Sequence, residues 1–242
     1  MNAPQTFGAM GEESGFLASM QKAMAPVLDF LFPPHCPACD AYVETRGAWC
    51  AACLANALRI RRLPLSGAHR KVIDEAWAFG VYQGALRSLL LPLKFKGRTD
   101  GLPALGTFLL AADEKLPRAA WMPGIAVPVP LFPKKEKTRG YNQTELIFRA
   151  WLEADGWTWR RALRRTRMTE PQYGLDAVGR AANVRDAFTV SDDEAREAIA
   201  GRPVLLLDDI FTTGSTLAEC ARVLKKAGAE SVVAWVLASD RD

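Results

Sequence analysis

The strongest constraint on the fold is a stretch near the C-terminus in which an apolar run, an acidic pair and a hydroxyl-rich turn follow one another. Residues 204–207 form a short, continuous apolar run, which is typical of a strand buried on both faces of a parallel sheet. Asp208 and Asp209 come directly after it, at the carboxyl end of the predicted strand. Open α/β sheets bind their ligands at this end of their strands. The sequence therefore predicts an α/β fold with a ligand site beside the two carboxylates.

The turn after the acidic pair is rich in small polar residues that suit a phosphate group. A helix is expected over residues 218–226, ended by Gly228. The first turn of a helix leaves backbone N–H groups unpaired, and its dipole favours negative charge. Two adjacent carboxylates accept hydrogen bonds from a vicinal diol or reach a hydrated cation. A sugar 5-phosphate fits between the two features. The residues of the turn are Thr212, Thr213, Gly214, Ser215 and Thr216.

The acidic pair has a second reading, because metal-binding corners of phosphoryl-transfer proteins also place carboxylates after a strand. The Walker A pattern and the Rossmann glycine fingerprint are both absent from the sequence. The complete string from residue 204 to 217 resembles the signature with which type I phosphoribosyltransferases bind 5-phosphoribosyl-1-pyrophosphate (PRPP). The resemblance implies that Asp208 and Asp209 hold the ribose hydroxyls and that residues 212–216 hold the 5-phosphate. The two histidines, His35 and His69, lie far from this string in the sequence.

Four of the five cysteines form two closely spaced pairs, Cys36/Cys39 and Cys50/Cys53. Each Cys-x-x-Cys turn can place two thiolates on one tetrahedral zinc ion, and four sulfur ligands leave no open position for a catalytic water. The spacing is typical of a zinc ribbon, so a structural Zn²⁺ site is expected. The alternatives are a pair of disulfides, unlinked thiols, or a site in which His35 replaces one sulfur.

The whole chain divides into four segments. Residues 1–32 are expected to form an amphipathic helix, residues 33–56 the zinc ribbon, residues 57–74 a linker, and residues 75–242 the main domain. In the main domain we expect strands at 76–82 and 124–130 and helices at 84–95, 102–113 and 143–154. The turns around these elements deliver cations to one rim of the sheet. The candidates for a catalytic role there are Lys94, Lys137 and Arg139.

A basic and aromatic segment over residues 157–188 allows three interpretations. It can form a mobile hood over the site. It can bind single-stranded nucleic acid, because guanidinium groups pair with phosphates and bases stack on aromatic rings. It can also be a solvated basic strand whose tryptophans, Trp157 and Trp159, belong to the core. The residues assigned to the hood or the nucleic-acid surface are Arg160, Arg161, Arg164, Arg165, Arg167 and Gln172.

The order of these motifs resembles that of the ComF family, phosphoribosyltransferase-like proteins associated with bacterial DNA uptake. The resemblance covers about residues 28 to 240 and rests on the motifs above together with residues 94–98, 127–130, 139–143 and 172–183. It implies a type I phosphoribosyltransferase-like parallel sheet flanked by helices, with a small N-terminal zinc-ribbon subdomain. Tyr141 departs from the phenylalanine that is more common in the family, and it keeps the aromatic ring.

The resemblance implies a PRPP-binding protein of DNA uptake that transfers a phosphoribosyl group to an unknown acceptor and releases pyrophosphate. Mg²⁺ would accompany PRPP, and cations on the rim would stabilise the charge on the leaving group. The alternative is a non-catalytic module that binds single-stranded DNA in response to PRPP. Single-stranded DNA and other DNA-uptake proteins are the candidate partners besides PRPP.

The sequence lacks an apolar segment long enough to cross a bilayer, so an integral membrane protein is not expected. Glu12 and Glu13 stand where a signal peptide needs basic and then apolar residues, which favours a cytoplasmic protein.

Overall fold

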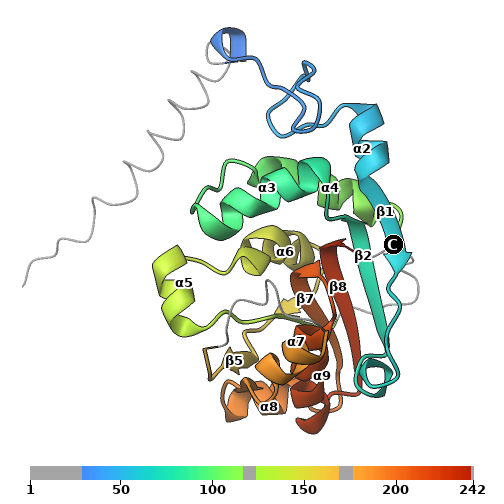
Figure 1. The fold of residues 1–242 in the computed structure, drawn as a ribbon, viewed down its shortest axis with the longest axis vertical. Coiled ribbons are helices and arrows are strands. Elements are labelled where there is room, and N and C mark those ends of the chain that lie inside the picture. Colours follow the sequence, from blue (N-terminus) through green and yellow to red (C-terminus); the bar gives the residue numbers. More distant parts are fainter. Residues whose placement is uncertain (1–28, 117–123, 169–176, 241–242) are drawn as a thin grey trace, which may run out of the picture.

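The computed structural model describes residues 29–116, 124–168 and 177–240. Its centre is a six-stranded sheet with the order β1-β2-β8-β7-β3-β4, and helices lie along it (Figure 1). The four strands from β2 to β3 and the short β4 run parallel, whereas β1 pairs with β2 in the antiparallel direction. The strands of this sheet are β1 (Leu58–Arg62), β2 (Glu75–Val81), β3 (Ile125–Pro128), β4 (Thr158–Trp159), β7 (Pro203–Phe211) and β8 (Ser231–Ser239).

Strand β7 is longer than the apolar run that marks it in the sequence. Its pairing with β8 continues from Pro203 to Phe211, so Asp208 and Asp209 lie within the last part of the strand instead of after it. Side chains alternate between the two faces of a strand. Leu206 therefore packs in one core cluster and Leu207 in the other. Helices cover both faces of the sheet, which is why the run is apolar without alternation.

Three helices pack on the face of the sheet that carries Leu207. They are α3 (Gly84–Phe95), α4 (Leu102–Asp113) and α6 (Gln143–Ala154), close to the expected bounds. The other face packs against α9 (Ser215–Lys226) and α8 (Asp193–Ile199). Lys137 and Arg139 lie in a short helix, α5 (Pro133–Arg139), which ends at Gly140 in the left-handed conformation. Proline at its first position and glycine after its last residue account for this helix.

The segment 157–188, ambiguous in the sequence, contributes β4 to the main sheet, and its later described residues form a small unit beside that sheet. Strands β5 (Leu163–Arg165) and β6 (Phe188–Val190) pair as an antiparallel ribbon, and helix α7 (Ala177–Val184) lies between them in the chain. We call β5, α7 and β6 the side unit. Gln172 lies outside the described residues.

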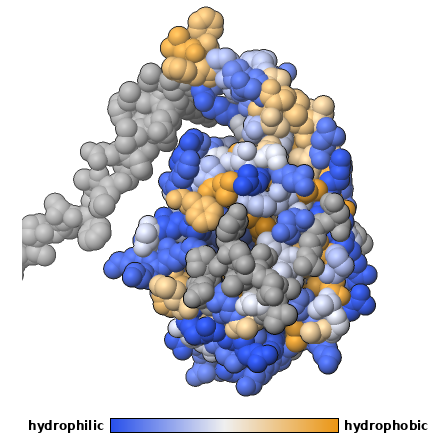
Figure 2. All heavy atoms as spheres, in the orientation of Figure 1, coloured by the Kyte–Doolittle hydropathy of each residue, from blue (hydrophilic) through white to orange (hydrophobic). Residues whose placement is uncertain are grey.

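Residues 57–74, expected to form a linker, contain strand β1 and the 3₁₀ helix η1 (His69–Lys71), which join the segment to the main domain. The zinc-ribbon residues lie at one end of the molecule and extend into helix α2 (Ala51–Ala57), which contains Cys53 (Figure 1). Most of the expected amphipathic helix over residues 1–32 lies outside the described residues. Where the description begins, Phe30, Leu31 and Phe32 are exposed and form a hydrophobic cap at that end (Figure 2).

The described ranges contain no helix that combines the length and the apolar character needed to cross a membrane.

Candidate functional site

The acidic pair meets a lysine from a distant part of the chain. Lys94 lies in the last turn of α3, and its Nζ is 2.9 Å from Oδ1 of Asp209. Asp209 is 3% exposed, and its backbone N–H donates a hydrogen bond to Oδ1 of Asp208. The Tyr141 hydroxyl donates to the carbonyl of Leu93, which fixes the end of α3 beside the site. The sequence placed Lys94 and the acidic pair on the same rim, and the structure brings them into contact.

Neighbouring groups do not fully balance the negative charge of the two carboxylates or satisfy all of their oxygens. Burial, together with the neighbouring Asp209 carboxylate, raises the pKa of Asp208 to about 8, although Lys94 opposes the shift. Oδ2 of Asp209 is buried and has no hydrogen-bond partner among the described residues. A buried acceptor without a partner costs about 1–3 kcal/mol. The pair is therefore suited to a ligand that brings hydrogen-bond donors or positive charge.

The raised pKa of Asp208 predicts a dependence of stability on pH. An acid whose pKa is higher in the folded state loses stability as pH rises from its unfolded pKa of about 4 towards its folded value. We expect Asp208→Asn to remove this loss. The variant should unfold at a higher temperature than the wild type at pH 8, and the difference should shrink at pH 5. Thermal unfolding followed by circular dichroism at both pH values measures it, and an equal difference at the two values would contradict the prediction.

Further cations surround the acidic pair, and they come from two other elements. Burial, reinforced by Arg139, Arg165 and Lys94, lowers the pKa of Lys135, while Asp209 opposes the shift. Burial also lowers the pKa of Arg139, which feels the field of Asp209. We call Lys94, Lys135, Arg139 and Arg165 the cation cluster. Lys137 is exposed and makes no ion pair or hydrogen bond with the described residues. The sequence selected Lys137 in this segment, and the interaction of Lys135 with Asp209 adds a second lysine of α5 to the candidates.

The hydroxyl-rich loop after β7 is shaped by a glycine. Gly214 has φ +80° and directly precedes Ser215, the first residue of α9. The helix therefore starts three residues before the expected start at residue 218. A Cβ at this position would lie 2.7 Å from the ring of Phe211 and 3.3 Å from Nδ1 of His69. Only glycine fits this position without strain. The hydroxyls of Thr213 and Ser215 are 3.0 Å apart, and Thr212 and Thr216 flank them at the surface.

His69 is a residue of this neighbourhood that the sequence analysis missed. It lies in η1, about 145 residues before Gly214 in the chain, and its ring packs beside the loop. No local pattern marks it, because the contact depends on the way that residues 63–74 fold over the sheet next to α9.

Within the described part of the arginine and tryptophan segment, the tryptophans do not form an open stacking surface. Trp157 is buried and packs edge-on against Trp235, with the ring centroids 6.1 Å apart, and Trp159 packs against the same core. The core reading of the tryptophans is therefore the one that the structure supports. The arginines have different surroundings: Arg160 pairs with Glu194, Arg161 pairs with Glu136 and Glu145, and Arg164 is exposed.

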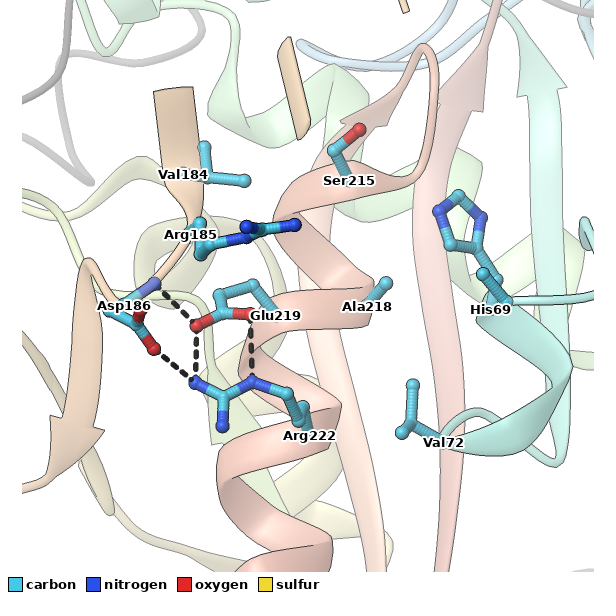
Figure 3. A pocket seen from close by; sticks show the side chains of 10 residues that line it. His69, Val72, Val184, Arg185, Asp186, Ser215, Ala218, Glu219 and Arg222 are labelled. Carbon is cyan, nitrogen blue, oxygen red and sulfur yellow. Dashed lines mark hydrogen bonds and ion pairs between the residues drawn. The ribbon is translucent and has the colours of Figure 1, made fainter. Parts of the chain in front are cut away.

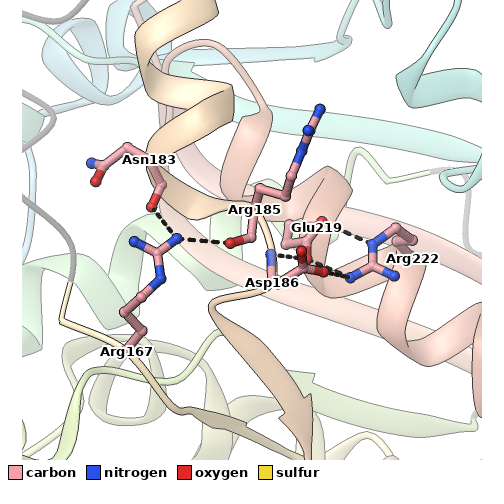
Figure 4. A network of polar contacts seen from close by, with 6 residues as sticks. All are labelled: Arg167, Asn183, Arg185, Asp186, Glu219 and Arg222. Atoms are coloured by element: carbon pink, nitrogen blue, oxygen red, sulfur yellow. Dashed lines mark hydrogen bonds and ion pairs between the residues drawn. The ribbon is translucent and has the colours of Figure 1, made fainter.

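Two of these arginines make contacts within the protein. The guanidinium carbon of Arg165 lies 5.2 Å from the ring centroid of Phe188, and its charge acts on Asp208. Arg167 donates to the backbone carbonyls of Asn183 and Arg185 and so ties the end of β5 to the segment after α7 (Figure 4).

The four paired cysteines come together at the zinc ribbon. Their sulfur atoms all lie within 4.8 Å of one another, and Sγ of Cys39 is 3.7 Å from Sγ of Cys50. Zinc–sulfur bonds of about 2.3 Å in a tetrahedron place sulfur atoms about 3.8 Å apart. Cys36, Cys39, Cys50 and Cys53 are free thiols, not disulfides, and they fit one structural zinc ion. His35 is not part of this sulfur cluster and instead faces Asp40.

The zinc ribbon is attached to the main domain by direct contacts. Nε1 of Trp49 donates to the carbonyl of Ala104 in α4 at 2.9 Å, and the Trp49 ring lies 6.0 Å from that of Phe108. Gly47 packs so closely on Pro103 that an added Cβ would lie 2.5 Å away. The ribbon is therefore docked on α4.

Comparison with known proteins gives matches to both parts of the chain. Residues 27–63 match the model of the double zinc ribbon domain, and residues 166–242 match that of the phosphoribosyl transferase domain. The chain is 29% identical to Competence protein F of Haemophilus influenzae over 85% of this chain and 84% of that protein. It is 34% identical to DNA utilization protein YhgH of Escherichia coli over 64% of this chain and 68% of that protein. It is 25% identical to Competence protein ComFC of Bacillus subtilis over 84% of this chain and 76% of that protein.

Proposed function

This chain belongs to the ComF family of competence and DNA utilization proteins, and we propose that it binds PRPP at the carboxyl ends of β7 and β3. We further propose that it transfers the phosphoribosyl group to an acceptor, with release of pyrophosphate, as part of DNA uptake. The zinc ribbon has a structural role in this proposal.

The observation that carries the proposal is the contact between the acidic pair and the cation cluster. Two carboxylates and four cations from α3, α5, β5 and β7 gather at one rim of the sheet. Burial lowers the pKa of Lys135, and repulsion from the neighbouring positive charges lowers it further. A polyanion would relieve this repulsion. PRPP combines a ribose diol for the carboxylates with phosphate groups for the cations.

Each part of the site has a separate task in the proposed reaction. Asp208 and Asp209 accept hydrogen bonds from the two ribose hydroxyls, and the loop from Thr212 to Thr216 holds the 5-phosphate through its hydroxyls and backbone N–H groups. Lys94, Lys135 and Arg139 stabilise the negative charge that develops on pyrophosphate as the bond to the anomeric carbon breaks. The chain therefore contributes position and electrostatics, and none of these tasks requires a nucleophile of its own.

The site also suits a divalent cation. The buried Oδ2 of Asp209 without a partner and the half-buried Asp208 beside it offer the carboxylate oxygens that Mg²⁺ prefers, directly or through water. When bound with PRPP, Mg²⁺ would neutralise pyrophosphate oxygens and orient the leaving group.

Two lysines of α5 provide a test of the cation cluster. We expect Lys135→Ala to weaken the binding of Mg²⁺·PRPP by about tenfold, because it removes a cation whose charge interacts with Asp209. Lys137→Ala removes the same charge from the same helix two residues further along, and it should leave the affinity within about twofold. Isothermal titration calorimetry measures both. Equal losses in the two variants, or a loss only in Lys137→Ala, would refute the assignment of Lys135.

Catalysis is tested by pyrophosphate release from Mg²⁺·PRPP in the presence of nucleobases, amines and oligonucleotides as acceptors. We expect release with one acceptor class, and its loss in the Lys135→Ala variant. Tight PRPP binding without release in any of these reactions would leave PRPP as a regulatory ligand and would refute the transferase proposal.

A further inference from the structure

A cavity of about 500 Å³ lies on the outer side of helix α9, next to the hydroxyl-rich loop but outside the acidic pair (Figure 3). It lies between η1 on one side and the segment from Val184 to Asp186 on the other. Neither the acidic pair nor Lys94 lines it, and Ser215 is the one residue of the proposed PRPP loop among its described lining. Cavities of about 300–1,000 Å³ hold small organic ligands. The volume exceeds the space that a single ion needs.

One end of the cavity carries an arginine and a histidine. Arg185 and His69 extend towards α9 from opposite sides, near Ser215 (Figure 3). The guanidinium of Arg185 makes no ion pair or hydrogen bond with the described residues, although the residue is anchored through its carbonyl, which accepts from Arg167 at 2.7 Å. Arg185 is suited to bind a phosphate, because its backbone is fixed and its guanidinium presents several hydrogen-bond donors in a planar fork.

The other end carries carboxylate hydrogen-bond acceptors whose positions are fixed by contacts with other residues. Glu219 is 9% exposed, and its Oε1 accepts from the backbone N–H of Asp186 at 2.8 Å. Arg222 donates to Glu219 and to Asp186 Oδ1, so one guanidinium holds both carboxylates (Figure 4). Asp186 has φ +53°, a left-handed conformation that is uncommon for a residue with a side chain. The network therefore holds the segment after α7 in a strained but fixed shape.

Apolar side chains line the cavity as well: Val72 from the segment after η1, Val184 at the end of α7, and Ala218 on α9. A ligand in the cavity thus meets the nitrogen groups of Arg185 and His69, apolar side chains, and the carboxylates of Glu219 and Asp186, which Arg222 holds in place. A nucleotide carries groups that match each of these: a phosphate, a flat apolar ring face, and amino or hydroxyl donors.

We propose that this cavity is a nucleotide site, separate from the PRPP site, in which Arg185 and His69 bind the phosphate. The ring lies against Val72, Val184 and Ala218, and Glu219 and Asp186 accept from its polar edge. Because Ser215 and the loop before α9 form a shared wall, the occupied cavity lies directly beside the proposed 5-phosphate position.

The test is calorimetric titration of the full chain with AMP and GMP, in the absence of PRPP. We expect both to bind, and adenosine or inorganic phosphate alone to bind at least about tenfold more weakly, because each lacks one half of the recognised groups. Arg185→Glu should weaken AMP binding at least about tenfold. Arg196→Glu is the matched control: it makes the same charge change at an exposed arginine of α8 outside the cavity, and it should leave AMP binding unchanged.

A second variant separates this site from the PRPP site. AMP binding should persist in Asp208→Asn/Asp209→Asn protein, whether or not the wild type binds PRPP. Loss of AMP binding in that variant would place the nucleotide in the PRPP site and overturn the inference while leaving the proposed function intact. Absence of AMP and GMP binding, or equal binding by Arg185→Glu and the wild type, would also overturn it.

The nucleotide can come from solution or from the end of a DNA strand, and competition distinguishes the sources. A ten-residue oligothymidylate with a 5-phosphate is compared with the same oligomer without it. Displacement of AMP by the phosphorylated oligomer alone identifies a strand end as a ligand of the cavity, whereas failure of both to displace AMP identifies a free nucleotide. Both results support the site. Equal displacement by the two oligomers would show that a terminal phosphate is not recognised and would refute the assignment of Arg185 and His69 to the phosphate monoester of a nucleotide.

Discussion

The affinity for Mg²⁺·PRPP is expected to fall at least about a hundredfold when Asp208 and Asp209 are both replaced by asparagine. Hydrogen bonds to charged groups contribute about 1.5–3 kcal/mol each, and the double variant converts two such acceptors into neutral amides. One of the two, Asp209, also holds Lys94 at 2.9 Å, so its loss releases a member of the cation cluster. Titration calorimetry with and without Mg²⁺ measures the change.

The control for this experiment is another adjacent pair of aspartates. Asp192 and Asp193 begin helix α8, and Asp192 caps it by accepting from the N–H of Ala195. Asparagine is an equally good cap, so Asp192→Asn/Asp193→Asn makes the same change of charge and should preserve both fold and PRPP affinity. If wild type and both variants bind PRPP equally, the acidic pair does not contact the sugar. If the wild type does not bind PRPP, the proposed function fails.

Replacement of Cys36 and Cys39 by serine is expected to abolish zinc binding and to unfold the ribbon. Structural zinc sites supply about 10 kcal/mol or more of folding free energy, because the metal binds the folded form only. The double variant retains two of four sulfur ligands, which cannot close a tetrahedral site. Elemental analysis should show one zinc ion per wild-type chain and none in the variant. Limited proteolysis should cut the variant within residues 33–56.

A single substitution next to the site provides the control. His35 precedes Cys36 but lies outside the sulfur cluster, so His35→Ala should keep one zinc ion per chain. Full zinc content in the cysteine variant would show that the thiols are not the ligands. Zinc loss in His35→Ala would show that the histidine replaces one of them.

The parts of the fold that the sequence predicts well are those with a strong local cause. Residues 204–207 are buried on both faces and are predicted as a central strand, and the helices expected at 84–95, 102–113 and 143–154 are α3, α4 and α6. The paired cysteines predict their own cluster, because each turn has the geometry of a metal ligand pair.

The parts that the sequence does not predict depend on contacts between distant segments. Strand β1 contains three arginines and reads as a linker, and it becomes a strand only because β2 offers an unpaired edge. The choice between Lys135 and Lys137 depends on how α5 is rotated against the sheet. The position of His69 beside Gly214 depends on a loop that folds across the sheet. In each case a tertiary contact determines what the segment or residue does, and local sequence preferences do not indicate it.

Strand β1 has one more consequence, for the behaviour of the protein at high concentration. An exposed sheet edge offers unpaired N–H and C=O groups that can recruit a strand from another molecule. Here one edge is a strand with Arg59, Arg61 and Arg62 and an irregular register, and the opposite edge is β4, which has two residues. Charge, irregular pairing and brevity all disfavour strand addition. The sheet therefore ends at both sides in features that oppose edge-to-edge aggregation, and the strand that carries the zinc ribbon also protects the solubility of the domain.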